Sequence, residues 1–158
     1  MTQTVILRAD FSGAPLQDLK NWLAISRSSE DDMLIDLLGA SAELLHAFTG
    51  QFPLEVTLEE RVANTGGEHH LRSRPVQAVL AVHLLEKDGT ARALESEAFS
   101  TAIDEHGTAT LALLEPSDAP TVSVQLVAGL APDWEALARS LRRGLIQLAA
   151  GFYQDRDV

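Results

Sequence analysis

SSEDDMLIDLLGASAELLHAFTGQF, from Ser28 to Phe52, is the stretch around which the chain is organised. Its apolar side chains recur at offsets of three and four residues, which predicts one amphipathic helix rather than a strand. The predicted apolar stripe consists of Leu34, Leu37, Leu38, Leu44, Leu45 and Phe48. A helix of about twenty residues spans about 30 Å, so this spine helix can support a small domain.

Both ends of the spine helix are marked in the sequence. Ser28 or Ser29 can cap its start, with an aspartate three residues later as a capping box requires. The acidic run Glu30 to Asp32 complements the positive end of the helix dipole. Gly50 offers a left-handed C-cap, and Pro53 prevents the helix from resuming.

Composition excludes several classes of protein. The 158 residues predict one domain, or a helical body with one insertion, and the hydrophobic and charged fractions of 46% and 22% are ordinary for a globular protein. The chain has no cysteine, which excludes disulfides, thiol catalysis and cysteine-ligated metals. Apolar runs are too short to predict a membrane span. The net charge of −11 argues against nonspecific binding of nucleic acid by the whole surface.

A shorter helix precedes the spine helix. Residues 4–8 form a β-like run, and Pro15 suits the first turn of a helix that extends to Ala24. One face of this short helix carries the side chains of Leu16, Leu19, Trp22 and Leu23. Because only a few residues join the two helices, they are predicted to form a helical hairpin.

After Pro53 the apolar period changes to two. Residues 54–58 alternate between apolar and polar types, which predicts a strand with one solvated face. Glycine-containing turns at residues 87–90 and 105–107 predict two hairpins, and a further alternating strand covers residues 122–128. Strands linked by hairpins are antiparallel.

The last helix is predicted to open at Pro132 and Asp133. Its apolar stripe comprises Leu137, Leu141, Leu145, Leu148 and Phe152. The predicted class is therefore α+β: a helical bundle of a short, a long central and a long C-terminal helix, with an antiparallel β block between the second and last helices. We predict a single domain, residues 1–158, that carries residues 54–129 as a β-rich insertion.

Candidate chemical groups in the sequence favour ordinary structural roles. Glu68-His69-His70 is the most metal-like cluster, but adjacent histidines in a strand point in opposite directions and no third ligand follows at a recognisable spacing, so a solvated loop is the favoured interpretation. The pair Glu59-Glu60 is interpreted as a wet strand edge. No nucleophile elbow or phosphate-binding loop is present. We therefore predict no catalytic residue, no metal and no cofactor.

Two groups of residues are candidates for a protein interface. Arg139, Arg142 and Arg143 can hold an acidic partner, although a solvated helix face is the default interpretation. The aromatic pair Phe152-Tyr153, followed by Arg156, lies near a chain end and has the residue types that anchor partners. The alternative is that Phe152 closes the core with Tyr153 at its rim. Residues 153–158 are mostly polar and are predicted to form a loose end.

The order and spacing of these elements resemble a head–tail connector (adaptor) protein of long-tailed phages and of gene transfer agents. The resemblance covers most of the chain. It is carried by Leu16-x-x-Leu19-Lys20-x-x-Leu23, Glu30-Asp31-Asp32, Phe48-Thr49-Gly50, Arg74-Pro75-Val76-Gln77, Asp88-Gly89-Thr90, Val122-x-Val124 leading to Ala128-Gly129, and the final Phe152-Tyr153-Gln154-Asp155-Arg156. The chain departs from the pattern at Leu130, where an aromatic is common, and at Leu71-Arg72-Ser73, which is less apolar than usual.

The resemblance implies a structural, non-enzymatic role. Such proteins form a ring of about twelve copies under the portal, extend the DNA channel and provide a platform for the next tail or stopper component. DNA then passes without specific binding, and the location is the neck of a particle assembled in the bacterial cytoplasm. A C-terminal helix or tail that reaches the portal gives Phe152, Tyr153 and Arg156 an interface role.

Three other functions remain open from the sequence. A small-ligand-binding α+β module requires a deep cavity with convergent polar groups. A particle assembly chaperone is soluble as a monomer and absent from the finished particle. A metal hydrolase requires His69 and His70 to act as ligands.

Overall fold

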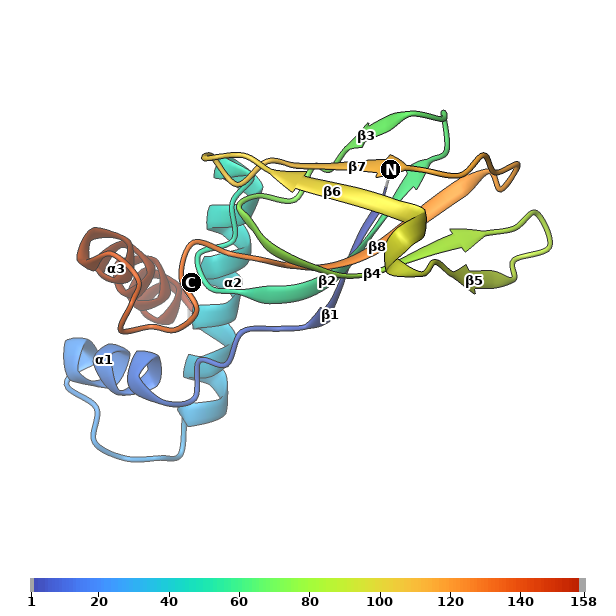
Figure 1. Cartoon of the computed structure of the whole chain (residues 1–158). Coiled ribbons are helices and arrows are strands. Elements are labelled where there is room, and N and C mark those ends of the chain that lie inside the picture. Colours follow the sequence, from blue (N-terminus) through green and yellow to red (C-terminus); the bar gives the residue numbers. More distant parts are fainter. Residues whose placement is uncertain (1, 157–158) are drawn as a thin grey trace. The chain divides into compact units, whose positions relative to one another are not determined.

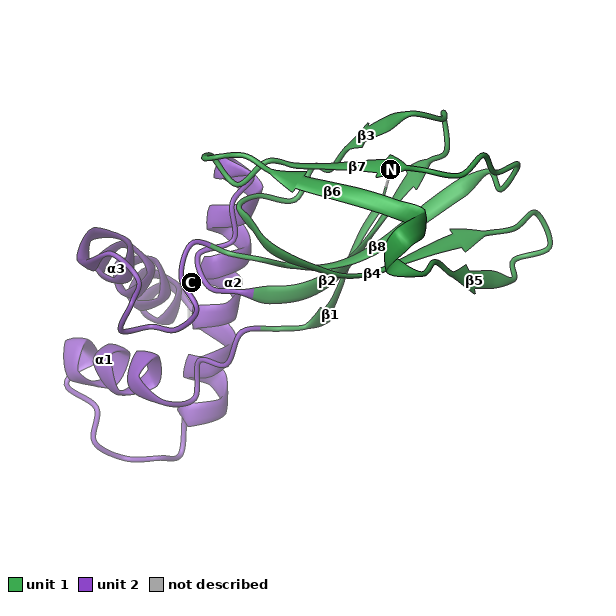
Figure 2. Ribbon diagram, in the orientation of Figure 1, with its two compact units in different colours: residues 1–8, 56–129 green, residues 9–55, 130–158 purple. Residues whose placement is uncertain are grey.

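The structure is a computed structural model that describes residues 2–156, in which three α-helices and eight strands are present. The chain divides into two compact units (Figure 2). The strand unit comprises residues 1–8 and 56–129, and the helical unit comprises residues 9–55 and 130–158. The predicted α+β class, with a strand block between the second and last helices, is confirmed (Figure 1). The single 1–158 domain stays a prediction.

The helical unit consists of α1 (Ala14–Leu23), α2 (Asp31–Thr49) and α3 (Arg139–Asp155). α3 contacts both α1 and α2. The core that they enclose is built from Phe11, Leu16, Leu19, Leu34, Leu38, Leu54, Trp134, Leu137, Leu145, Ile146, Ala149 and Ala150. The predicted spine helix is therefore α2, and its central leucines lie in this core.

The buried stripe of α2 is shorter than the sequence pattern predicts. Leu34 and Leu38 are fully buried, whereas the side chain of Phe48 is 84% exposed. Ten residues at 3.6 per turn place Phe48 about 80° around the helix from Leu38. Phe48 therefore lies at the margin of the stripe and in the last turn of the helix.

The predicted cap is wrong at the start of α2 and confirmed at its end. The predicted serine cap and capping box are wrong: the N-cap residue is Glu30, and no side chain caps the helix. One reason is that the carboxylate of Asp31 accepts a hydrogen bond from Lys20 Nζ at 2.8 Å. At the other end, Gly50 adopts φ 73° and its N–H donates to the His46 carbonyl oxygen, which confirms the predicted left-handed cap.

The prediction that the last helix opens at Pro132 is wrong, because α3 begins at Arg139. The side chain of Asp133 accepts a hydrogen bond from the Ala136 N–H at 2.8 Å, which closes a turn rather than an α-helix. Trp134 is buried in this turn, and its Nε1–H donates to Asp18 Oδ2 at 2.8 Å. The turn is thus fixed to α1 before the helix starts.

The buried face of α3 differs from the predicted stripe. Its buried residues are Leu145, Ile146, Ala149 and Ala150, whereas Leu148 and Phe152 of the predicted stripe are exposed. At about 100° per residue, the buried positions centre about 70° around the helix from Leu145, and Leu148 and Phe152 lie on the other side of Leu145. Leu137, the first residue of the predicted stripe, is buried in the preceding turn.

The strand unit contains two antiparallel sheets. The strands are β1 (Thr2–Leu7), β2 (Val56–Ala63), β3 (Glu68–His70), β4 (Val76–Leu85), β5 (Ala91–Ala93), β6 (Phe99–Ile103), β7 (Ala109–Leu113) and β8 (Thr121–Ala128), with a 3-10 turn at Ser96–Ala98. The larger sheet has the order β1-β2-β8-β4-β5, and the smaller has the order β3-β7-β6. Because β1 pairs with β2, the sheet includes a segment that precedes the first helix as well as the predicted strand block.

Both predicted hairpins are present. β4 pairs with β5 and β6 pairs with β7. Gly89 and Gly107 have φ of 87° and 76° in the connecting turns, where an L side chain is strained. At Gly107 a side chain would also collide with Pro75. Glycine is therefore required at this turn for two independent reasons.

Candidate interface sites

The metal-like cluster Glu68-His69-His70 places its side chains on two faces of a strand. Glu68–His70 is strand β3 rather than a solvated loop, so that interpretation is wrong. As expected for neighbours in a strand, His69 is buried and His70 is exposed. The Nε2 atom of His69 accepts a hydrogen bond from the Thr65 N–H at 3.2 Å. Within residues 2–156, no group of three His, Cys, Asp or Glu side chains is placed to hold a metal ion.

Glu59 and Glu60 of β2 are not a wet strand edge. Glu60 is 0% exposed, and its carboxylate accepts hydrogen bonds from the backbone and hydroxyl of Ser73. Glu59 accepts hydrogen bonds at 2.7 Å from Ser123 Oγ and from Arg61 Nε. The Ser123 hydroxyl, followed by Arg61, lowers the pKa of Glu59 below its usual range. Both carboxylates therefore hold the strand unit together.

The C-terminal turn of α3 is tied to the start of α2. The hydroxyl of Tyr153 donates to Glu30 Oε2 at 2.7 Å, and the Arg156 guanidinium lies 3.8 Å from the centroid of the Tyr153 ring. Arg27 and Arg156 also approach the Glu30 carboxylate, at 3.4 and 4.0 Å. The hydrogen bond from Tyr153 lowers the pKa of Glu30, and the same bond raises the pKa of Tyr153.

The alternative in which Phe152 closes the core and Tyr153 lies at its rim is reversed in the structure. Tyr153 packs against the helical core, whereas Phe152 is 38% exposed. Residues 153–155 continue α3, so the predicted loose end does not begin at Tyr153; Asp157 and Val158 lie outside the described residues. Of the three predicted interface residues, Phe152 presents the exposed aromatic, while Tyr153 and Arg156 bind Glu30. The interface role of all three stays a prediction.

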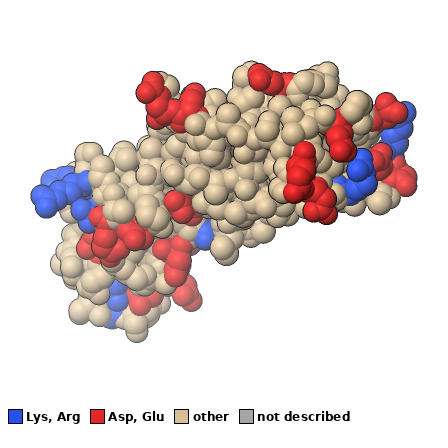
Figure 3. Space-filling model, in the orientation of Figure 1, with Lys and Arg blue, Asp and Glu red and all other residues tan. Residues whose placement is uncertain are grey.

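The three predicted arginines meet in one surface pocket. This arginine pocket has a volume of about 500 Å³ and is lined by Asp18, Asn21, Trp22, Arg139, Arg142, Arg143 and Ile146. The guanidinium of Arg143 lies 5.4 Å from the centroid of the Trp22 ring. In Figure 3 one group of Lys and Arg atoms lies over α3, and further Lys and Arg atoms lie over the strand unit. The sequence pattern placed Trp22 on an apolar face and so missed its role as a wall of this pocket.

Several large apolar side chains are exposed at the surface. The exposed set in the strand unit includes Val5, Ile6 and Leu7 of β1, Leu80 of β4 and Leu114. Phe48 and Phe152 are the exposed phenylalanines of the helical unit. None of the helices in the described part of the chain is long and apolar enough to cross a membrane. Apolar residues gathered at a surface are typical of a protein–protein interface.

Solved structures with this fold come from gene transfer agent particles. A chain in the neck of an empty particle, determined with C6 symmetry, matches with a TM-score of 0.81 at 19% identity, over 99% of this chain and 85% of that chain. A chain in the neck of a native particle with C12 symmetry matches with a TM-score of 0.79 at 19% identity and the same coverage. A chain of the native virion matches at 0.79 and 18% identity, over 99% and 86% of the two chains.

At these identities the likeness establishes the fold. It confirms the fold implied by the resemblance to head–tail connectors, over nearly the whole chain. No family model matches the sequence, and no curated protein matches it significantly.

Proposed function

We propose that this chain is a structural component of the neck of a phage or phage-like particle, and specifically an adaptor that forms a ring under the portal. The match to a neck chain over 99% of the sequence carries the proposal. A likeness to a chain in a particle with C12 symmetry supports a ring of about twelve copies. In this role the ring extends the DNA channel, binds the portal and presents a platform for the next tail or stopper component.

The surface chemistry of the chain supports an assembled state. Exposed apolar side chains such as Leu7 and Leu80 become buried when copies and partners pack together. Because the matched chains belong to particles, their fold favours a structural component over a chaperone that leaves the particle. A structural role requires no catalytic residue, and we propose none.

The proposed ring is tested with purified portal. We expect the protein to bind portal rings and to form a closed ring of about twelve copies on them, visible by electron microscopy. Protein that stays monomeric and unbound in the presence of portal would contradict the adaptor role. The same mixture of protein and portal rings can then be used to test which surface of the protein binds the portal.

We predict that the end of α3 is needed for portal docking. Phe152→Asp replaces an exposed aromatic side chain by a charged one, and deletion of residues 154–158 removes Arg156. Both variants should therefore lose portal binding. Deletion of residues 153–158 is a poorer test, because it also removes the hydrogen bond from Tyr153 to Glu30. Pull-down with portal rings measures binding, and a thermal melt of each variant measures folding.

Phe48→Asp is the matched control for portal docking, since it changes another exposed phenylalanine of the helical unit. It should leave portal binding unchanged. Equal binding by the wild type and by both α3 variants would show that this end of α3 does not dock.

We predict that the isolated protein does not bind DNA appreciably at physiological salt. The net charge of −11 repels phosphate, and a DNA channel functions best when its wall does not retain the duplex. Fluorescence anisotropy of a labelled duplex at about 150 mM salt should show no binding tighter than about 100 μM. Micromolar affinity for the duplex at that salt concentration would contradict this prediction. If the Arg142→Glu variant then lost that affinity, the DNA-binding site would be the arginine pocket.

A further inference from the structure

The lining of the arginine pocket carries three positive charges and one negative charge, that of Asp18. Arg139, Arg142 and Arg143 fall within one five-residue segment, although the protein as a whole is acidic. None of the three forms an ion pair within residues 2–156. The Nε atom of Arg142 is buried without a hydrogen-bond partner there. Asp18 supplies the one carboxylate of the pocket lining, and it also accepts the hydrogen bond from Trp134. A buried N–H without an acceptor is unfavourable, and a bound oxygen atom would satisfy it.

The chemistry of the pocket selects an acidic protein segment as its ligand. Guanidinium groups bind carboxylates and phosphates through paired N–H donors. Beside them, Trp22 is 46% exposed and Ile146 adds an apolar wall. A fitting ligand therefore carries carboxylates next to an apolar side chain. A nucleic acid duplex offers phosphate while its bases stay stacked inside, and the net charge of −11 opposes its approach.

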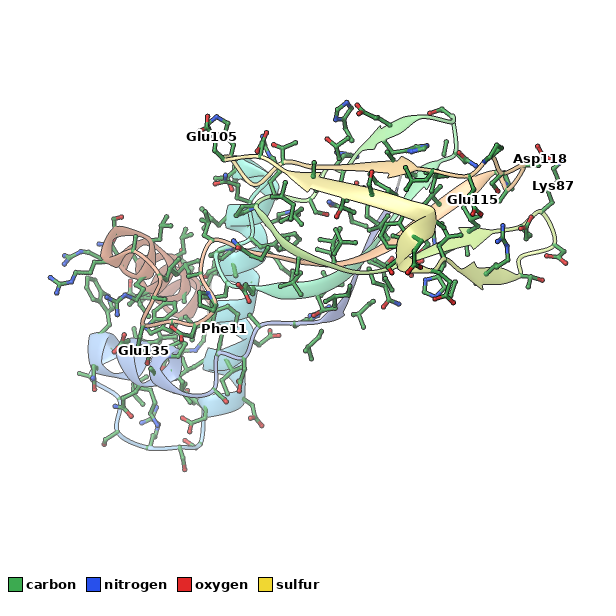
Figure 4. All side chains as sticks on the ribbon, in the orientation of Figure 1. Phe11, Lys87, Glu105, Glu115, Asp118 and Glu135 are labelled. Atoms are coloured by element: carbon green, nitrogen blue, oxygen red, sulfur yellow. The ribbon has the colours of Figure 1, made fainter. Side chains whose placement is uncertain are left out.

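A segment with these properties is present on the strand unit of the same chain. It is the connection between β7 and β8, Leu114-Glu115-Pro116-Ser117-Asp118. Leu114 is 58% exposed, and Glu115 and Asp118 are exposed as well (Figure 4). Neither carboxylate forms an ion pair with the described residues of its own chain. We call this segment the acidic loop.

We propose that the arginine pocket of one copy binds the acidic loop of a second copy. Three guanidinium groups then face two carboxylates, and Leu114 contacts the apolar wall at Trp22. Because the pocket and the loop are different surfaces, the contact is heterologous, and heterologous contacts close into rings when the rotation between copies permits. The proposal rests on the ring that the proposed function requires and names the residues that join its neighbouring copies.

Cross-linking tests this contact directly, because the chain contains no cysteine. Asn21→Cys places a thiol at the pocket, and Pro116→Cys places one on the acidic loop. Mixed under mild oxidation, the two variants should form a disulfide-linked dimer at least about tenfold faster than a control mixture, since binding holds the thiols at roughly millimolar effective concentration. The control pairs Asn21→Cys with Thr90→Cys, which lies in the exposed turn between β4 and β5.

Charge reversal tests which groups make the contact. In the cysteine variants, Arg142→Glu with Arg143→Glu should reduce the rate to that of the control, and so should Glu115→Arg with Asp118→Arg. Combining a reversed pocket with a reversed loop should restore fast cross-linking, which a general loss of stability would not. A net-charge control, Lys87→Glu with Arg92→Glu, changes two exposed cations of the β4–β5 hairpin and should leave the rate unchanged.

The outcomes separate this contact from the adaptor role. Cross-linking no faster than the control, or no restoration by the combined reversal, overturns the proposed contact even if the wild type forms rings on the portal. Fast, charge-dependent cross-linking without any ring on the portal supports the contact and contradicts the adaptor role. Binding of a DNA duplex that disappears in Arg142→Glu with Arg143→Glu would assign the pocket to phosphate and would also overturn the proposal.

Discussion

Leu38→Asp is expected to unfold the helical unit. Leu38 lies in the middle of α2, is 0% exposed and belongs to the core that α1, α2 and α3 enclose. Truncation of a buried leucine alone costs about 2–5 kcal/mol, and the aspartate adds the cost of a charge without a partner in the core. The total is comparable with the whole stability of a typical domain, about 5–15 kcal/mol.

Both tryptophans, Trp22 and Trp134, lie in the helical unit, so their fluorescence reports its folding. Chemical denaturation followed by fluorescence and by circular dichroism should show loss of the cooperative transition in Leu38→Asp. Phe48→Asp is the matched control, because it introduces the same group on the same helix at a position that is 84% exposed. It should change the free energy of unfolding by at most about 0.5 kcal/mol. Similar transitions for both variants would show that the assigned core face of α2 is wrong.

Local patterns predicted those parts of the fold that short-range interactions determine. The C-cap at Gly50 and the hairpin turns at Gly89 and Gly107 follow from positive φ, which a sequence reveals through glycine. In each case the residues that decide the structure are neighbours in the sequence.

The errors arise where a distant residue decides the local structure. Asp18 fixes Trp134 in a turn and so delays the start of α3, and Lys20 engages Asp31 at the place where a capping box was expected. These pairs are 116 and 11 residues apart along the chain. The exchange of roles between Phe152 and Tyr153 depends on which face of α3 packs against α1 and α2.

The arginine pocket could be predicted only in part. The clustering of Arg139, Arg142 and Arg143 is visible in the sequence, and in the structure all three line one pocket. The contribution of Trp22 could not be predicted, because its position on α1 relative to α3 depends on the packing of the three helices. A tryptophan placed on an apolar helical face is ordinarily assigned to the core.

The buried carboxylate of Glu60 was not predicted, because its partners follow it by 12 and 13 residues in an irregular segment. It accepts hydrogen bonds from the Arg72 N–H at 2.6 Å, the Ser73 N–H at 3.1 Å and the Ser73 hydroxyl at 2.7 Å. Gln3 donates to the same hydroxyl at 2.8 Å, which links β1 to this cluster. Three donors therefore converge on one side chain in the interior of the strand unit.

Glu60→Leu is expected to destabilise the strand unit strongly. Replacing a buried charged group by an apolar residue can be neutral when its partners are replaced at the same time, as has been found for buried ion pairs. Here two of the donors are backbone N–H groups, which no side-chain substitution removes, so Glu60→Leu leaves them buried without an acceptor. At about 1–3 kcal/mol for each unsatisfied donor, the loss should reach several kcal/mol and lower the melting temperature by about 10 °C or more.

A double-mutant cycle with Ser73→Ala distinguishes unsatisfied donors from a simple loss of volume. Ser73→Ala removes the hydroxyl donor and should cost about 1 kcal/mol in the wild-type background. In the Glu60→Leu background the same change removes a donor that already lacks its acceptor, so its cost should fall to that of losing the hydrogen bond from Gln3. Circular dichroism melts of the four proteins supply the measurement. An additive cycle, or a Glu60→Leu variant with the wild-type melting temperature, would show that the hydrogen bonds to Glu60 do not stabilise the strand unit.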